Sequence, residues 1–322
     1  MRFYLFPLAF LFCFNVVAQN KINFKNPPPF PKLFAEGYIN TGARERDFAI
    51  SPDGNEIYFT LQAPHGVFQT IVFIKKNSKG KWSKPEIVSF AGKFTDLEPA
   101  FSPDGKKLFF ASNRPQKGTE VKDFDIWYVE RTATGWSDPV NPGFPLNRSH
   151  DEFYPAVTTS GNIYFTAAYS SAERKEDIYV SKWENGKYQE PVALDTMVNS
   201  SNFEFNAYVS PDETLIIFSS YGREDDLGGG DLYISYKVEN GKWVRSKHMT
   251  MLNSTKLDYC PFISPDKKML FFTSERNALT STYAERPSYQ QLLKEFSGAL
   301  NGGGNIYWVD FKAIAGALGI KQ

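Results

Sequence analysis

A tetrapeptide of the form Ser-Pro-Asp-Gly recurs along this 322-residue chain, each time just before an apolar strand sequence. Its second position, which we take as the marker of each unit, falls at residues 52, 103, 159, 211 and 265, so the spacings are 51, 56, 52 and 54 residues. The third copy has Thr159 and Ser160 in place of Pro and Asp, and the fourth and fifth share only the first three residues, Ser-Pro-Asp. A period of this length indicates one structural unit used five times.

The first four units each contain four short strand sequences in the same order, and the fifth contains the first three. In the second unit an apolar strand at 99–101 runs into the tetrapeptide, where Pro presets φ and Asp bonds its own backbone, and an aromatic strand returns at 108–110. A third strand follows at 126–129, and a turn at Gly135 leads to the fourth. Four antiparallel strands per unit are typical of a propeller blade. We therefore expect an all-β fold, a five-bladed β-propeller of four-stranded antiparallel blades.

The fifth unit has no fourth strand sequence of its own. Residues 33–40 end in the step Ile39-Asn40, and a similar apolar-Asn step at 146–147, 198–199 and 252–253 closes the fourth strand of other units. The N-terminal strand is therefore expected to complete the last blade, which closes the ring and removes two exposed sheet edges. On this basis the propeller spans residues 33–312, and residues 313–322 form a C-terminal tail.

The first eighteen residues have the pattern of a secretory signal peptide. Arg2 supplies the positive charge, the run from Phe3 to Val17 is almost wholly apolar, and small side chains precede the expected cleavage site after Ala18. The protein is then exported, to the periplasm or outside the cell. The apolar run is shorter than the roughly 20 residues of a membrane-spanning helix, so no membrane span is expected. Residues 19–32 are a proline-rich lead-in.

Composition narrows the classes of partner and reaction. The chain has 36 Lys and Arg against 36 Asp and Glu, so nothing indicates a nucleic-acid partner. Cleavage leaves Cys260 as the only cysteine, which excludes an intramolecular disulfide. The sequence contains no G-x-S-x-G, H-E-x-x-H or phosphate-binding glycine motif. We expect a monomer without a resident cofactor.

The Ser-Pro-Asp-Gly units resemble the WD40-like (PD40) repeat of TolB-like β-propellers, over roughly residues 33–310. The resemblance implies a periplasmic, protein-binding role. It implies this by analogy only, because one fold hosts many functions. TolB itself has a six-bladed propeller and a further domain. This chain departs from it, with five units and no room for that domain.

An acidic residue stands seven positions before the marker in every unit, where the innermost strand begins. These residues are Glu45, Asp96, Glu152, Glu204 and Asp258. A ring of five acids near the central channel is expected, and each close pair would repel by about 1–4 kcal/mol. One compensation is structural: Arg114, Arg223 and Arg276 follow the second strands and could form salt bridges between blades. The other is a ligand, either a cation such as Ca²⁺ or a polyhydroxylated sugar.

The position five residues before the marker varies between units, which suits specific recognition. It holds Asp47, Glu98, Tyr154, Asn206 and Cys260. The ligand-binding candidates are Asp47, Glu98 and Tyr154, joined by Arg46 and His150, which occur in one unit only. His150 also fits an exposed loop histidine, and Cys260 fits a small buried filler.

An insertion at residues 277–304 contains a segment with helical spacing at 287–296. We expect a short helix whose apolar side chains cover the propeller rim. The alternative is a helix that binds a partner.

Two functions fit these observations. The first is an exported binding or scaffold protein that presents the face bearing the acids to a protein or glycan. The second is a carboxylate-based glycan-cleaving enzyme, similar to the five-bladed arabinanases, with its site at the central channel. The regular repetition of the acids favours binding, because catalysis needs carboxylates in different environments.

Overall fold

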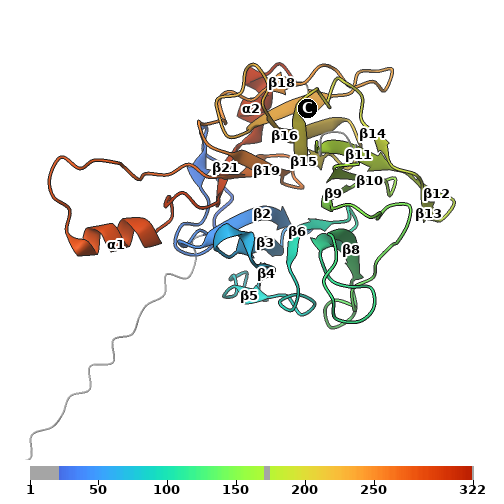
Figure 1. Cartoon of the computed structure of the whole chain (residues 1–322), viewed down its shortest axis with the longest axis horizontal. Coiled ribbons are helices and arrows are strands. Elements are labelled where there is room, and N and C mark those ends of the chain that lie inside the picture. Colours follow the sequence, from blue (N-terminus) through green and yellow to red (C-terminus); the bar gives the residue numbers. More distant parts are fainter. Residues whose placement is uncertain (1–21, 170–174, 321–322) are drawn as a thin grey trace, which may run out of the picture.

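The computed structural model describes residues 22–169 and 175–320. The predicted signal peptide and the first residues of the lead-in lie outside this range. The fold is a five-bladed β-propeller in which each unit forms one antiparallel blade (Figure 1). The innermost strands contact one another in the cyclic order β2, β6, β9, β15, β19 and back to β2. The predicted fold class is therefore confirmed.

The strands of each blade run from the central channel outward, and the fifth blade ends on the N-terminal strand. Blade 1 contains β2 (Arg44–Ile50), β3 (Glu56–Gln62), β4 (Gln69–Lys75) and β5 (Glu86–Ile87). Blade 2 contains β6 (Asp96–Phe101), β7 (Lys107–Ser112) and β8 (Asp125–Glu130). Blade 3 contains β9 (Glu152–Val157), β10 (Ile163–Ala167), β11 (Asp177–Ser181) and β14 (Val192–Ala193), with a small hairpin of β12 (Trp183–Glu184) and β13 (Lys187–Tyr188). Blade 4 contains β15 (Phe203–Val209), β16 (Leu215–Tyr221), β17 (Asp231–Tyr236) and β18 (Lys247–His248). Blade 5 contains β19 (Asp258–Ile263), β20 (Met269–Ser274), β21 (Asn305–Asp310) and β1 (Lys32–Leu33).

The Ser-Pro-Asp-Gly turns are held by their own side chains. The serine hydroxyl donates to the aspartate two residues later, as in Ser102 to Asp104 at 2.7 Å, and accepts the backbone N–H that opens the second strand. The fourth turn position has a positive φ in every one of these turns, which favours glycine. Units four and five place Glu213 (φ 57°) and Lys267 (φ 56°) there instead.

Glu213 has a second function in the turn of unit three, which lacks the aspartate. Its carboxylate accepts hydrogen bonds from Thr158 Oγ1 at 3.0 Å, Asn162 Nδ2 at 2.9 Å and the Tyr164 hydroxyl at 2.8 Å. The carboxylate of blade 4 therefore replaces the missing aspartate of blade 3 and joins the two blades.

Replacing Glu213 by Gln is expected to destabilise the protein by about 1–3 kcal/mol at pH 7, because donors of the unit-three turn lose a charged acceptor. Burial raises the pKa of Glu213, but hydrogen bonds from Ser160, Tyr164 and Thr158 outweigh it and hold the pKa below its usual value. A lowered folded pKa contributes stability above the unfolded pKa, and this contribution is lost as the pH falls through the folded pKa. Urea unfolding should show a difference from wild type at pH 7 that shrinks near pH 3. An equal difference at both pH values would contradict this assignment.

The N-terminal strand closes the ring, as predicted. β1 pairs with β21, with Lys32 opposite Trp308 and Leu33 opposite Tyr307. This strand is shorter than the predicted segment. Further contacts with β21 come from the Phe34 N–H, which donates to Ile306 O at 2.9 Å, and from Asn40, whose side-chain amide bonds both the N–H and the C=O of Ile306 at 2.8 Å each. The apolar-Asn steps do not close the fourth strands themselves. Their asparagines, Asn147, Asn199 and Asn253, each bond the backbone of a third strand in the same two-sided way.

Blade 2 departs from the four-stranded pattern at its outer edge. Its fourth strand is reduced to an isolated bridge between Tyr128 and Val140. Pro139 and Pro142 flank this bridge. Pro142 has no N–H to donate, so the ladder cannot extend past it, whereas on the other side the Ser137 N–H still donates to Glu130 O at 2.9 Å.

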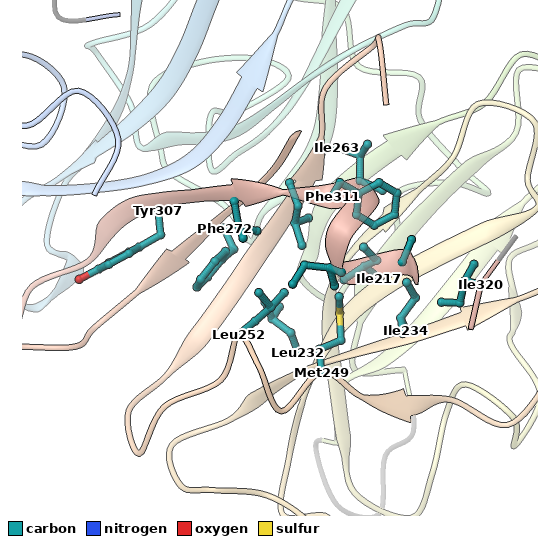
Figure 2. Close-up of a cluster of buried hydrophobic side chains, with 14 residues drawn as sticks. Ile217, Leu232, Ile234, Met249, Leu252, Ile263, Phe272, Tyr307, Phe311 and Ile320 are labelled. Carbon is teal, nitrogen blue, oxygen red and sulfur yellow. The ribbon is translucent and has the colours of Figure 1, made fainter. Parts of the chain in front are cut away.

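The core lies between adjacent blades, where aliphatic and aromatic side chains of neighbouring sheets meet. Figure 2 shows the cluster between blades 4 and 5, in which Ile217, Leu232 and Phe272 are fully buried. Helix α2 (Phe311–Ala317) packs here through Phe311 and joins the cluster. The segment predicted as a C-terminal tail is therefore part of the core as far as Ile320.

Two other segments also differ from expectation. In the lead-in, Phe24 stacks on Phe34 with ring centroids 5.6 Å apart, so aromatic packing fixes a segment that its prolines predicted only as extended. The predicted helix exists as α1 (Tyr289–Ser297), but none of its residues is buried and it projects away from the propeller (Figure 1). The expectation that it covers the rim is wrong, because none of its apolar side chains is buried. Among the described residues, no helix is long and apolar enough to cross a membrane.

Candidate functional site

Each innermost strand carries a β-bulge five residues before the marker. The pairing register shifts there, and the backbone is left-handed, with φ between 49° and 60°. None of the five residues is glycine, so each conformation costs about 1–3 kcal/mol and must be held by its surroundings. The residues are Asp47, Glu98, Tyr154, Asn206 and Cys260.

Hydroxyl groups on the neighbouring blade support three of the bulges. Thr60 Oγ1 accepts the N–H of Glu98 at 3.0 Å, Thr166 Oγ1 accepts that of Asn206 at 3.0 Å, and Thr273 Oγ1 accepts that of Asp47 at 3.3 Å. In blade 2 the equivalent second-strand residue is Ala111, which has no hydroxyl. The N–H of Tyr154 is bound by Oε2 of Glu98 instead, at 2.7 Å.

The bulges bring six side chains together in the central channel, and we call this group the plug. It consists of Arg46, Asp47, Glu98, Tyr154, Asn206 and Cys260. Arg46 Nε donates to Asp47 Oδ1 at 2.7 Å, and a terminal Arg46 nitrogen donates to Glu98 Oε1 at 2.9 Å. Asn206 Nδ2 donates to Glu98 Oε1 at 3.3 Å, and Cys260 Sγ donates to Asp47 Oδ1 at 2.8 Å. Four of the five ligand-binding candidates predicted from the sequence are thus brought together.

The electrostatics of the plug depend on burial and on Arg46. Burial raises the pKa of Glu98, and the Arg46 guanidinium opposes this rise. Desolvation lowers the pKa of Arg46, but neighbouring acidic groups, Asp47 foremost, more than offset it, so Arg46 stays charged. Burial also raises the pKa of the Cys260 thiol, and Asp47 adds to the rise. The thiol therefore stays protonated, which makes Cys260 a poor nucleophile.

The plug separates two cavities of the channel, one on each face of the propeller. The loop face carries the starts of the innermost strands and the loops between second and third strands. The hairpin face carries the Ser-Pro-Asp-Gly turns. The loop-face cavity has a volume of about 280 Å³, and Arg46, Glu98 and Asn206 of the plug reach it.

Aromatic rings form much of the wall of the loop-face cavity. Phe153, Phe205 and Tyr259 stand six residues before their markers, and Phe124 precedes β8. In a regular strand, neighbouring side chains point to opposite faces, so positions five and six before the marker could not both face one cavity. The bulge allows this, because it inserts one extra residue and turns the strand.

Glu176 is the second carboxylate of the loop-face cavity. It lies in the loop before β11 and is half-buried. Burial raises its pKa, with Asp151 adding to the rise, and its own charge raises the pKa of Glu98. Among the described residues its carboxylate has no hydrogen-bond or ion-pair partner.

The five predicted ring acids are buried at the starts of the innermost strands. Their carboxylates accept hydrogen bonds from nearby groups. Glu45 accepts one from the Thr41 hydroxyl at 2.6 Å, and Glu152 accepts one from the Tyr169 hydroxyl at 2.6 Å. The interactions that the structure shows for these carboxylates join no two of them. The expected mutual repulsion across the channel is therefore not seen among the described residues.

The predicted arginines do contact these acids, but within one unit rather than between blades. Arg276 lies 2.8 Å from Asp258, and Arg223 lies 2.8 Å from Glu204. Arg114 pairs with Asp96 in the same way. The contact between blades is made with a backbone carbonyl instead. Arg223 also donates at 2.7 Å to the carbonyl oxygen of Val198, which lies in the connection from blade 3.

The remaining predicted residue, His150, is exposed, and its ring packs edge-on against Tyr169 with centroids 5.9 Å apart. It is not among the residues that line the loop-face cavity. The sequence reasoning missed the aromatic wall and Glu176. Among the described residues, no group of three or more His, Cys, Asp or Glu side chains is arranged to hold a metal ion. The Ca²⁺ alternative stays a prediction.

Of the comparisons with known proteins, only the one with solved structures finds matches. No model of a known protein family matches the chain, and no curated protein matches it. A solved glycoside hydrolase is similar in structure, with a TM-score of 0.52 at 8% identity, over 88% of this chain and 91% of the hydrolase. This likeness shows the propeller fold alone.

Two further solved structures are similar to a lesser degree. An endo-arabinase from Bacteroides thetaiotaomicron VPI-5482 has a TM-score of 0.49 at 13% identity, over 78% of this chain and 99% of that one. A TolB-like protein from Agrobacterium tumefaciens has a TM-score of 0.48 at 16% identity, over 84% of this chain and 91% of that one.

Proposed function

We propose that this chain is an exported binding protein and that its loop-face cavity holds the end of a glycan. The observation that carries the proposal is the lining of this cavity, where four aromatic rings surround the carboxylates of Glu98 and Glu176 and the amide of Asn206. Export rests on the signal-peptide pattern of residues 1–18.

A sugar has the complementary surface. Its C–H groups form an apolar face that packs on aromatic rings, and its hydroxyls donate to carboxylate and amide oxygens. Pockets for small molecules combine an apolar lining with a few such polar groups and usually measure about 300–1,000 Å³. A cavity of about 280 Å³ suits one terminal sugar rather than a long chain.

A glycan array probed with the purified protein tests the proposal. We expect binding to a restricted set of glycans that share a terminal sugar, with competition by that free sugar. Phe205→Ala should weaken binding by about tenfold or more, because the ring forms part of the cavity wall. Phe203→Ala is the matched control, since Phe203 lies on the same strand but packs against Tyr221 and is 40% exposed. A blank array, as a protein ligand would produce, or equal effects of the two variants, would overturn the proposal.

Glycan cleavage is the second candidate, and the pair Glu98 and Glu176 favours it. Glycoside hydrolysis uses two carboxyl groups in different environments, one as acid and one as base or nucleophile. Here one carboxylate is held by Arg46 and the other has no partner among the described residues. Incubation of the best-bound glycan with the protein, followed by mass spectrometry, distinguishes the candidates: an unchanged glycan supports binding alone. Release of a shorter glycan that stops with Glu176→Gln would support cleavage.

A further inference from the structure

The hairpin face of the channel contains a second cavity, on the other side of the plug. This hairpin-face well has a volume of about 300 Å³. Its floor includes Glu98 and Tyr154 of the plug, and its walls come from the later residues of the innermost strands and from the prolines of the turns.

The walls of the hairpin-face well are apolar and stiff. Pro99, Pro155 and Pro261 follow directly after the bulged residues of their strands, where the ladder is already interrupted and proline's missing N–H costs least. Phe262 and Tyr208 add aromatic surface from blades 5 and 4. Because proline fixes φ, this part of the wall is formed before any ligand arrives.

The polar groups at both ends of the well already have partners. Both Glu98 oxygens accept hydrogen bonds, from Arg46 and Asn206 and from the Tyr154 N–H, and the Tyr154 hydroxyl donates to Pro261 O at 3.0 Å. At the rim, the Lys267 ammonium lies 3.5 Å from the Asp212 carboxylate. The well therefore offers no charge to an ionic ligand, and a sugar buried there would leave hydroxyls without partners.

We infer that the hairpin-face well is a second binding site, for a compact neutral molecule with an aromatic or branched aliphatic body. Burial of apolar surface and shape supply the recognition. An apolar cavity of about 150 Å³ is enough to bind benzene. A well of about 300 Å³ admits a bicyclic ring. The well and the loop-face cavity are distinct, because the plug lies between them and Glu98 is the one residue that lines both.

Indole is a suitable probe, and its binding to the purified protein can be followed by ligand-observed NMR titration. We expect saturable 1:1 binding whose affinity does not change between low and high salt, since no ion pair forms. Ala100→Phe should reduce affinity by about tenfold or more. This variant gives blade 2 the aromatic ring that blade 5 has at the equivalent position as Phe262, and the ring would occupy the well.

Controls locate the site and separate blocking from misfolding. Val67→Phe adds the same ring at a loop position that is 78% exposed and should leave indole binding unchanged. If Ala100→Phe fails to fold, Ala100→Val, which fills less of the well, should still weaken binding measurably. Absence of saturable indole binding would overturn the inference. So would binding that Ala100→Phe leaves intact, or binding that Phe205→Ala abolishes, because the latter would place indole on the loop face.

Discussion

Removal of residues 19–42 is expected to eliminate most of the stability of the propeller. The deletion takes away β1, the Asn40 contacts with β21 and the buried side chains of Phe34 and Ile39. Loss of one buried Phe costs about 3–5 kcal/mol and of one buried Ile about 2–5 kcal/mol. These losses approach the whole stability of a typical domain, about 5–15 kcal/mol. Thermal unfolding and size-exclusion chromatography should show aggregation or a greatly lowered transition.

A second deletion provides the control for chain length. Replacement of residues 280–296 by a short Gly-Ser linker removes most of the projecting arm with α1, none of whose helical residues is buried. It should change the melting temperature by only a few degrees. If the N-terminal deletion stays monomeric and melts like the full protein, closure by β1 does not hold the ring together.

Arg46→Met is expected to destabilise the protein by about 3–5 kcal/mol at pH 7, because two buried carboxylates lose their shared cation. Asp47 and Glu98 are both almost fully buried, and Arg46 bonds each of them. The effect should depend on pH. Burial raises the pKa of Glu98, and without Arg46 mainly the hydrogen bond from the Tyr154 N–H opposes that rise. An acid with a raised folded pKa loses stability as the pH rises from its unfolded pKa toward its folded one, so the variant should be less impaired at pH 5 than at pH 8.

Urea unfolding of two further variants isolates the charge effect. Arg131→Met breaks a salt bridge at the surface, where Arg131 lies 2.7 Å from Glu56, and should cost no more than about 1 kcal/mol. The double variant Arg46→Met/Glu98→Gln removes one uncompensated charge and should recover part of the loss. An Arg46→Met protein within about 1 kcal/mol of wild type at pH 7 would show that Arg46 does not hold the plug together.

The sequence predicted the parts of the fold that repeat. The Ser-Pro-Asp-Gly turns, the antiparallel order and the completion of blade 5 by the N-terminal strand follow from local chemistry that recurs in every unit. Even the irregular third turn has a carboxylate as its hydrogen-bond acceptor. Ser160 has no carboxylate, so Glu213 of blade 4 supplies it. What the repeat did not predict was the source of that carboxylate, which depends on contacts between blades.

The candidate site was only partly predictable. The positions of Asp47, Glu98 and Tyr154 were identified because they vary where other positions repeat. Their bulged backbone has no sequence signal, since Glu, Tyr and Cys rarely adopt a positive φ and are held there by neighbouring blades. Without the bulge, alternation assigns Phe205 and Asn206 to opposite faces, which hid the aromatic wall. Glu176 lies in a loop with no acidic equivalent in other units, so no periodicity indicated it.

The most direct test of the central claim is a calorimetric titration of wild type and Glu176→Gln with the strongest glycan from the array. Glu176→Gln keeps the shape of the side chain and removes its charge. The carboxylate that it replaces lines the loop-face cavity and has no partner among the described residues. Asp96→Asn, at a buried acid bound by Ser112 and Arg114, is the matched control. The proposal predicts that Glu176→Gln weakens binding by about tenfold or more with an unchanged melting temperature, and that Asp96→Asn lowers the melting temperature with little effect on affinity. Unchanged affinity in Glu176→Gln, with a loss of binding in Asp96→Asn, would contradict a glycan site in the loop-face cavity.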